Sequence, residues 1–182
     1  MKNRIIILPV LLLCICLAAS ACTADVSALE NLCFDVRELD LAGAAEYVYD
    51  SERYFASAKA LMAELPEKKA EIARKIYSNM SFSNFEENDG VCTLTVKYVD
   101  FKKLIEAAEA KTNAGASATD ALGEIVESKG FSAYMKTAEG VKVTLAKEGE
   151  NALVPIGRAG VNSEFTAMLG LETFLGWFIL QM

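Results

Sequence analysis

The sequence predicts an α+β domain in which N-terminal helices pack on a curved, mainly antiparallel sheet. Apolar residues recur at helical spacing over residues 26–76, whereas they alternate with polar residues over 80–99 and 141–156. Turn-forming residues divide the alternating ranges into hairpins. Helices followed by strands that pair through hairpins are typical of α+β domains and not of alternating β–α–β units.

Three helices are expected before the first strand. The first covers residues 26–37, and its apolar face consists of Leu29, Leu32, Cys33 and Val36. Asp40 has a side chain suited to capping, so we expect a second helix from this residue to Tyr49. A third helix is expected over about 57–76. Pro66 should kink or split it, because proline cannot donate a helical hydrogen bond.

Two hairpins are expected. In the first, Met80 and Phe82 alternate with serines, residues 87–90 form a turn, and a strand follows over 91–99. The apolar face of that strand consists of Cys92, Leu94, Val96 and Tyr98. In the second hairpin, a strand over 141–147 turns at 148–151 and returns over 152–156.

Helices are also expected between the two hairpins and after the second one. The first of these covers residues 101–111 and is followed by a loop of small residues over 113–117. Thr119 or Asp120 should cap the next, which stops near Gly130. From Asn162 onward the chain is apolar, and we expect it to be helical.

The start of the chain has the layout of a secretory signal peptide. Residues 1–4 are basic, residues 5–17 are almost wholly apolar, and residues 18–21 are small. The apolar run is shorter than the roughly 20 residues that a membrane-spanning helix needs. The small residues and the cysteine after them resemble the bacterial lipobox, which implies that Cys22 is the site of lipid attachment.

The expected organisation is therefore a signal peptide over 1–21, a short linker over 22–27 and one domain over 28–182. Lipid with two or more acyl chains gives durable anchoring, so the protein is expected on the outer face of the cell membrane. The chain has 25 Asp and Glu against 18 Lys and Arg, a net charge of −7. This excess of negative charge argues against binding to nucleic acid.

Several kinds of catalytic chemistry are excluded by composition. The sequence contains no histidine, so imidazole cannot activate a nucleophile or ligate a metal. We expect no catalytic residues, no metal site and no cofactor. A cluster of acids at Glu86, Glu87 and Asp89 falls in the expected turn, where such residues are common for backbone reasons.

Cys33 and Cys92 form a candidate disulfide. Both are expected to point into the core, the first from a helix and the second from a strand. A disulfide is chemically allowed outside the cytoplasm. Buried cysteines also occur as small apolar residues without a bond between them, and this is the simpler interpretation.

Two groups of aromatic residues allow more than one interpretation. The first group, which core packing explains more simply than a pocket mouth, consists of Tyr47, Tyr49, Tyr54 and Phe55. The second lies in the tail over 165–182, where residues 174–180 are apolar on all sides. That stretch is too short to span a bilayer, and extending it back to Phe165 would bury Glu172 in hydrocarbon. We expect the tail to pack on the concave face of the sheet; the alternative is contact with lipid or a partner.

Three short motifs resemble those of Gram-positive surface lipoproteins with a cone-shaped, ketosteroid-isomerase-like fold, also called nuclear transport factor two-like or cystatin-like. These motifs lie at residues 40–47, at 141–149 and at 162–165. The tryptophan that usually stands in the closing strand is missing from residues 152–156. The resemblance implies a fold and a location, and it supplies no catalytic residues.

The sequence thus favours a non-enzymatic domain that is tethered to the membrane and binds a small ligand or a protein of the cell envelope. One alternative is a small-molecule enzyme that uses the cone as its active site. It would need a carboxylate or a tyrosine with a shifted pKa deep in the pocket. The other alternative is a structural or assembly role through the apolar tail.

Overall fold

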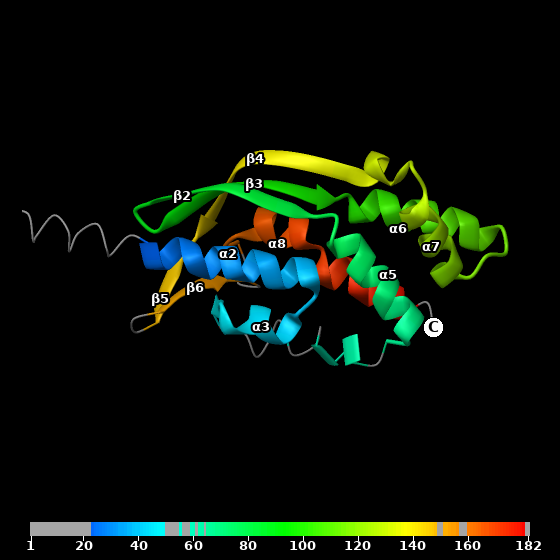
Figure 1. The fold of residues 1–182 in the computed structure, drawn as a ribbon, viewed down its shortest axis with the longest axis horizontal. Helices are drawn as coiled ribbons and strands as arrows, with labels where there is room; N and C mark the ends of the chain where they lie inside the picture. Colours follow the sequence, from blue (N-terminus) through cyan, green and yellow to red (C-terminus); the bar gives the residue numbers. More distant parts are fainter. Residues whose placement is uncertain are drawn as a thin grey trace, which may run out of the picture.

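The computed structural model describes residues 23–49, 55, 59–60, 62–63, 65–148, 151–156 and 160–180. The expected signal peptide, Cys22 and Tyr54 lie outside these residues. The described residues form helices and two three-stranded sheets, which confirms the α+β class (Figure 1). None of the described helices combines the length and the apolar composition needed to span a bilayer.

Helix α2 (Thr23–Glu38) has the apolar face that the sequence predicts. Its four inward residues are 0–2% exposed: Leu29, Leu32, Cys33 and Val36. The helix begins three residues before the expected start, so residues 23–27 belong to it and are not a linker. Helix α2 contacts β2 and β6, and its axis follows the longest dimension of the molecule (Figure 1).

Helix α3 (Leu41–Glu46) is capped by Asp40 as expected, since the Asp40 side chain accepts a hydrogen bond of 3.0 Å from the Gly43 amide. The expected extension of this helix to Tyr49 is wrong. Val48–Tyr49 is instead a short strand, β1, which pairs in parallel with β6 (Asn151–Pro155). The distant strand β6 supplies hydrogen bonds that the local sequence pattern does not reveal.

Pro66 splits the third expected helix. Residues 62–63 are helical before it, and α5 (Glu67–Tyr77) begins directly after it with Pro66 at the N-cap. Proline is tolerated there because the first amides of a helix have no helical partner. Ile72 and Ile76 of α5 are buried as expected.

The larger sheet has the order β2-β3-β4, with β2 (Ser81–Asn88), β3 (Val91–Val99) and β4 (Met135–Thr144). The first hairpin is confirmed, and Asn88 pairs with Val91 across a two-residue turn. The turn residues Asp89 and Gly90 have φ angles of 52° and 77°. Turns with positive φ at both positions match the twist of hairpin strands.

Two helices and a short 3-10 turn connect β3 to β4. They are α6 (Phe101–Asn113), α7 (Ala118–Glu127) and η1 (Phe131–Tyr134). The expected cap of α7 is wrong, because Thr119 and Asp120 lie inside its first turn. Ser117 is the cap: its backbone is extended, and its hydroxyl accepts a hydrogen bond of 3.1 Å from the Asp120 amide.

The strand expected over 141–147 is two strands that belong to different sheets. Strand β4 begins earlier, at Met135, because β3 offers partners from Val99 back to Val91. Strand β5 (Ala146–Glu148) pairs with β6 in the smaller sheet, whose order is β1-β6-β5. Leu145 lies between the two strands, and its amide donates to the Gly90 carbonyl at 2.9 Å.

The C-terminal tail is helical and largely buried. It consists of α8 (Ser163–Leu169), a π-helical turn η2 (Leu171–Leu175) and α9 (Gly176–Leu180). Helix α8 contacts β3 and β4, so this part packs on the sheet as expected. The later part packs on helices instead. The centre of the Phe174 ring lies 5.3 Å from the ring centre of Phe101 in α6 and 6.1 Å from the ring centre of Tyr77 in α5.

Candidate functional site

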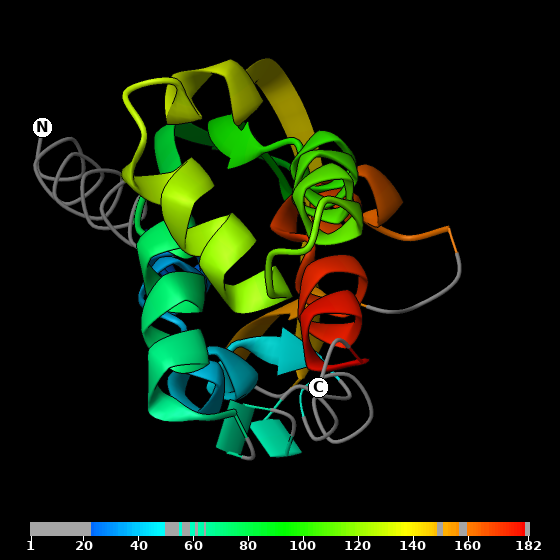
Figure 2. The same ribbon diagram turned by 90° about the vertical axis from the view of Figure 1, so that its right-hand side faces the viewer.

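Helices α5 and α7 lie side by side and run parallel. Two ion pairs join them. Lys68 Nζ lies 2.8 Å from Asp120 Oδ1, and Lys75 Nζ lies 3.3 Å from Glu127 Oε1. On each helix the paired residues are seven apart, which is two turns or about 10 Å along the axis. Figure 2 shows the two helices next to each other from the α6–α7 end of the molecule.

The local sequence fixes these helices where their side chains can meet. In α5, Glu67 stands in the first turn and Lys75 in the last, an order that complements the helix dipole. In α7, Ser117 both caps the helix and donates a hydrogen bond of 2.7 Å to Asp120 Oδ2. The Asp120 carboxylate is therefore fixed by Ser117, the cap of its own helix, and by Lys68 of α5.

A groove of about 390 Å³ lies between the two helices. Ile72 and Gly123 are its least polar lining, and a Cβ atom added at Gly123 would lie 3.7 Å from the Ile72 side chain. The remaining lining residues are Lys68, Glu71, Lys75, Thr119, Asp120, Glu124 and Glu127. Four carboxylates and two lysines thus surround a small apolar patch.

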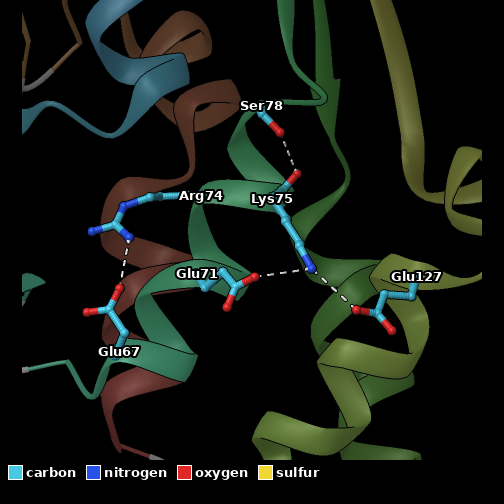
Figure 3. A network of polar contacts seen from close by, with 6 residues as sticks. All are labelled: Glu67, Glu71, Arg74, Lys75, Ser78 and Glu127. Atoms are coloured by element: carbon cyan, nitrogen blue, oxygen red, sulfur yellow. Dashed lines mark hydrogen bonds and ion pairs between the residues drawn. The ribbon is translucent and has the colours of Figure 1, made fainter.

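Lys75 is shared between the helices. Its ammonium lies 3.4 Å from Glu71 on the same helix and 3.3 Å from Glu127 on α7, as Figure 3 shows. The nearby Arg74–Glu67 pair, at 3.6 Å, lies away from α7 in the same view. Because one lysine serves two carboxylates, the groove keeps an excess of negative charge at this end.

The pKa values of three charged groups in the groove are shifted away from neutrality. The hydrogen bond from Lys68 lowers the pKa of Asp120, and the bond from Ser117 lowers it further. Bonds to Asp120 raise the pKa of Lys68, and bonds to Glu127 and Glu71 raise that of Lys75. These three groups are therefore charged at neutral pH, and none is suited to act as a general acid or base there.

The cysteines expected as a candidate disulfide are both buried. Cys33 is 2% exposed and Cys92 is 0% exposed, and the two are not joined by a disulfide. Burial raises the pKa of the Cys33 thiol well above its usual range, and the charge of Glu30 adds to this effect. A thiol of this kind is a poor nucleophile. Within the described residues, no group of three or more Cys, Asp and Glu side chains is placed to hold a metal ion.

Glu87 of the acidic turn and two residues of the first aromatic group, Tyr47 and Phe55, have structural roles. The Glu87 carboxylate accepts a hydrogen bond of 2.8 Å from the Gly90 amide and so closes the turn between β2 and β3. Phe55 is 1% exposed and belongs to the core, against which Tyr47 packs. In the tail, Trp177 Nε1 donates to Glu109 Oε1 of α6 at 3.0 Å.

Reasoning from sequence missed the groove, although a signal for it exists. Lys68 and Lys75 repeat with the same spacing as Asp120 and Glu127. Opposite charges that repeat every seven residues on two helices are a known sign of helix pairing. A scan against protein-family models finds no match, and searches of curated proteins and of solved structures find no similar chain.

Proposed function

We propose that this protein is an exported lipoprotein, anchored through Cys22, whose folded part binds another component of the cell envelope and catalyses no reaction. The observation that carries the proposal is the burial of the tail. Phe174 and Phe178 are each 0% exposed, and both belong to the continuous core. Helix α8 covers part of β3 and β4, and its Phe165 and Leu169 are each 0% exposed, so we assign recognition to the outer surface and not to that face of the sheet.

The groove between α5 and α7 is the proposed binding face. Lys111 pairs with Glu124 at 2.6 Å, but Glu71 and Glu127 share Lys75, so one carboxylate is in excess and suits a partner that presents basic side chains. Exposed ion pairs exchange partners at small cost, because their charges are already well solvated. Thr119 and Gly123 are small and leave room for an incoming side chain.

The two other functions that the sequence leaves open receive less support. An assembly role through the tail needs an exposed apolar surface, but Phe165, Leu169, Phe174 and Phe178 are each 0% exposed, whereas Leu180 is 85% exposed. An enzyme would need a shifted acid in a pocket. Burial raises the pKa of Asp35, with Asp40 and Glu46 adding to the shift, but Asp35 stands where α2 meets α3. The cone-shaped fold stays a prediction, which the order of helices before hairpins supports.

Metabolic labelling with a fatty acid tests the anchor. The unaltered protein should incorporate the label and sediment with membranes, whereas Cys22→Ala should lose the label and leave the membrane. Cys14→Ala is the matched control, because Cys14 lies inside the apolar run, and its labelling should be unchanged. Continued labelling of Cys22→Ala would contradict the proposal.

A basic peptide tests the groove. Oligolysine added to the soluble domain should shift the backbone NMR resonances of α5 and α7 more than those of the acidic β2–β3 turn. The variant Glu71→Gln, Glu127→Gln should weaken these shifts, whereas Glu86→Gln, Asp89→Asn, in the turn, should not. Equal shifts at both places would mean attraction by net charge alone, and the groove would then lose its proposed role.

A further inference from the structure

The start of α2 is tied closely to the proposed anchor. Helix α2 begins at Thr23, the residue that follows Cys22 in the chain. Neighbouring Cα atoms are about 3.8 Å apart, so a lipid on Cys22 would hold the first turn of α2 at the level of the lipid headgroups. With no linker between them, the anchor restricts how the folded part can sit on the membrane.

The start of α2 lies at one end of the molecule. Figure 1 shows it beside the β2–β3 turn and the β5–β6 hairpin, and the loop between α6 and α7 lies at the opposite end. Strand β3 and helix α6 follow one another along this direction. At about 3.3 Å per strand residue and 1.5 Å per helix residue, they span together about 50 Å.

We propose that the end of the molecule formed by the start of α2 and the β2–β3 turn faces the bilayer, and that α6 and α7 project away from it. The α5–α7 groove is then presented outward, where a partner in the envelope can reach it. This inference rests on the proposed lipid anchor at Cys22.

The charges of the surface support an upright position over one in which α2 lies flat on lipid. The outer side of α2 presents Phe34, which is 57% exposed, but Glu30 and Glu38 are exposed on the same helix. The Arg37 guanidinium stacks 5.3 Å from the Phe34 ring and bonds Glu38 at 2.9 Å, so its charge is already compensated. A single aromatic residue among carboxylates is a weak contact for a membrane surface.

The β2–β3 turn at the near end is acidic. Glu86 and Asp89 are exposed at the β2–β3 turn. Repulsion between these carboxylates and anionic headgroups would keep the turn just outside the headgroup layer while the acyl chains hold the protein. Salt would screen this repulsion, but the acyl chains hold the start of α2, so the near end should stay nearest the membrane at high salt.

Energy transfer to a labelled lipid tests the orientation. The full lipidated chain is placed in vesicles of phosphatidylcholine and phosphatidylglycerol with an acceptor dye on the outer leaflet. A donor dye is attached through Asn88→Cys at the near end, Phe34→Cys on α2, or Asn113→Cys at the far end. All three positions are exposed, and the chain without an added cysteine measures any labelling of Cys33 and Cys92.

Transfer should be strongest from position 88, intermediate from 34 and weakest from 113, with the same order at high salt. Equal transfer from 88 and 113, or strongest transfer from 34, would overturn the orientation. Vesicle binding by the Cys22→Ala chain separates the two proposals. If that chain binds as well as the lipidated one, the proposed anchor is wrong. If it does not bind, the anchor is supported, and the order of energy transfer tests the orientation separately.

Discussion

The side-chain amide of Asn162 hydrogen bonds to both backbone groups of Thr144. Asn162 Oδ1 accepts from the Thr144 amide at 2.8 Å, and Asn162 Nδ2 donates to the Thr144 carbonyl at 2.9 Å and to the Pro155 carbonyl at 3.1 Å. One residue thus joins the end of β4, the end of β6 and the start of α8. These bonds fix Asn162, the N-cap residue of α8, and so fix the start of that helix.

Replacing Asn162 should destabilise the domain. Asn162→Ala removes three hydrogen bonds, each with a net contribution of about 0.5–1.5 kcal/mol. It also places alanine at a φ of 50°, which costs about 1–2 kcal/mol. Asn162→Gly loses the bonds but tolerates this φ, so it should unfold at a temperature between those of the wild type and Asn162→Ala. Asn113→Ala, at an exposed helix end, is the control, and an equal effect there would argue against the role of Asn162.

Gly170 should be intolerant of any side chain. It has a φ of 63°, and a Cβ atom there would overlap the ring of Phe101. Gly170→Ala should lower the free energy of unfolding by about 1–3 kcal/mol for overpacking alone. Gly176→Ala is a matched control, because that glycine is helical and has open space around its Cβ position. Chemical denaturation should show a loss for position 170 and little change or a small gain for position 176.

Lys69 should make stability depend on pH in the alkaline range. It is 8% exposed, its ammonium donates to the Phe178 carbonyl at 3.3 Å, and it lies 5.0 Å from the Phe178 ring centre. Burial lowers the pKa of Lys69, so above that lowered value the unfolded chain binds more protons than the folded one. Stability contributed by this group therefore rises with pH until the ordinary lysine pKa of about 10.4 is reached.

The comparison of wild type with Lys69→Met isolates this effect. Methionine keeps the apolar stem and removes the charge, so the wild type should gain stability relative to this variant as the pH rises from 7 towards 10. Lys68→Met is the control, because Lys68 is exposed and its pKa is raised by Asp120. If the free energy of unfolding changed with pH in the same way for the wild type and for Lys69→Met, Lys69 would not be buried as a charged group.

The ion pairs across the groove should contribute little to folding. Lys68 and Asp120 have side chains that are 70% and 56% exposed, so water competes for both charges. A double-mutant cycle of Lys68→Met and Asp120→Asn should show a small favourable coupling at low salt that disappears at high salt. Coupling that persists at high salt would mean that the pair is part of the folded core and is not available to a partner.

Features set by local pattern could be predicted from the sequence. The apolar face of α2, the Asp40 cap and the Asp89–Gly90 turn each depend on residues a few positions apart. Features set by distant contacts could not. Strand β1 exists because Val48 pairs with Val154, and the groove exists because α5 meets residues 52 positions later in α7. The cap of α7 is predicted within a few residues. Ser117, Thr119 and Asp120 are all suitable capping residues, and only the backbone conformation shows that Ser117 is the cap.

The buried tail should be indispensable to the fold, and thermal unfolding of the soluble domain without residues 173–182 measures this. Truncating a single buried phenylalanine costs about 3–5 kcal/mol, against a total stability of about 5–15 kcal/mol for a domain. The deletion should therefore lower the midpoint severely or abolish folding, and Phe178→Ala alone should lower it clearly. Leu180→Ser, at a residue that is 85% exposed, should leave the midpoint unchanged. An unchanged midpoint for the deletion and for Phe178→Ala would mean that residues 173–182 are dispensable, and the proposal that rests on a buried tail would fail.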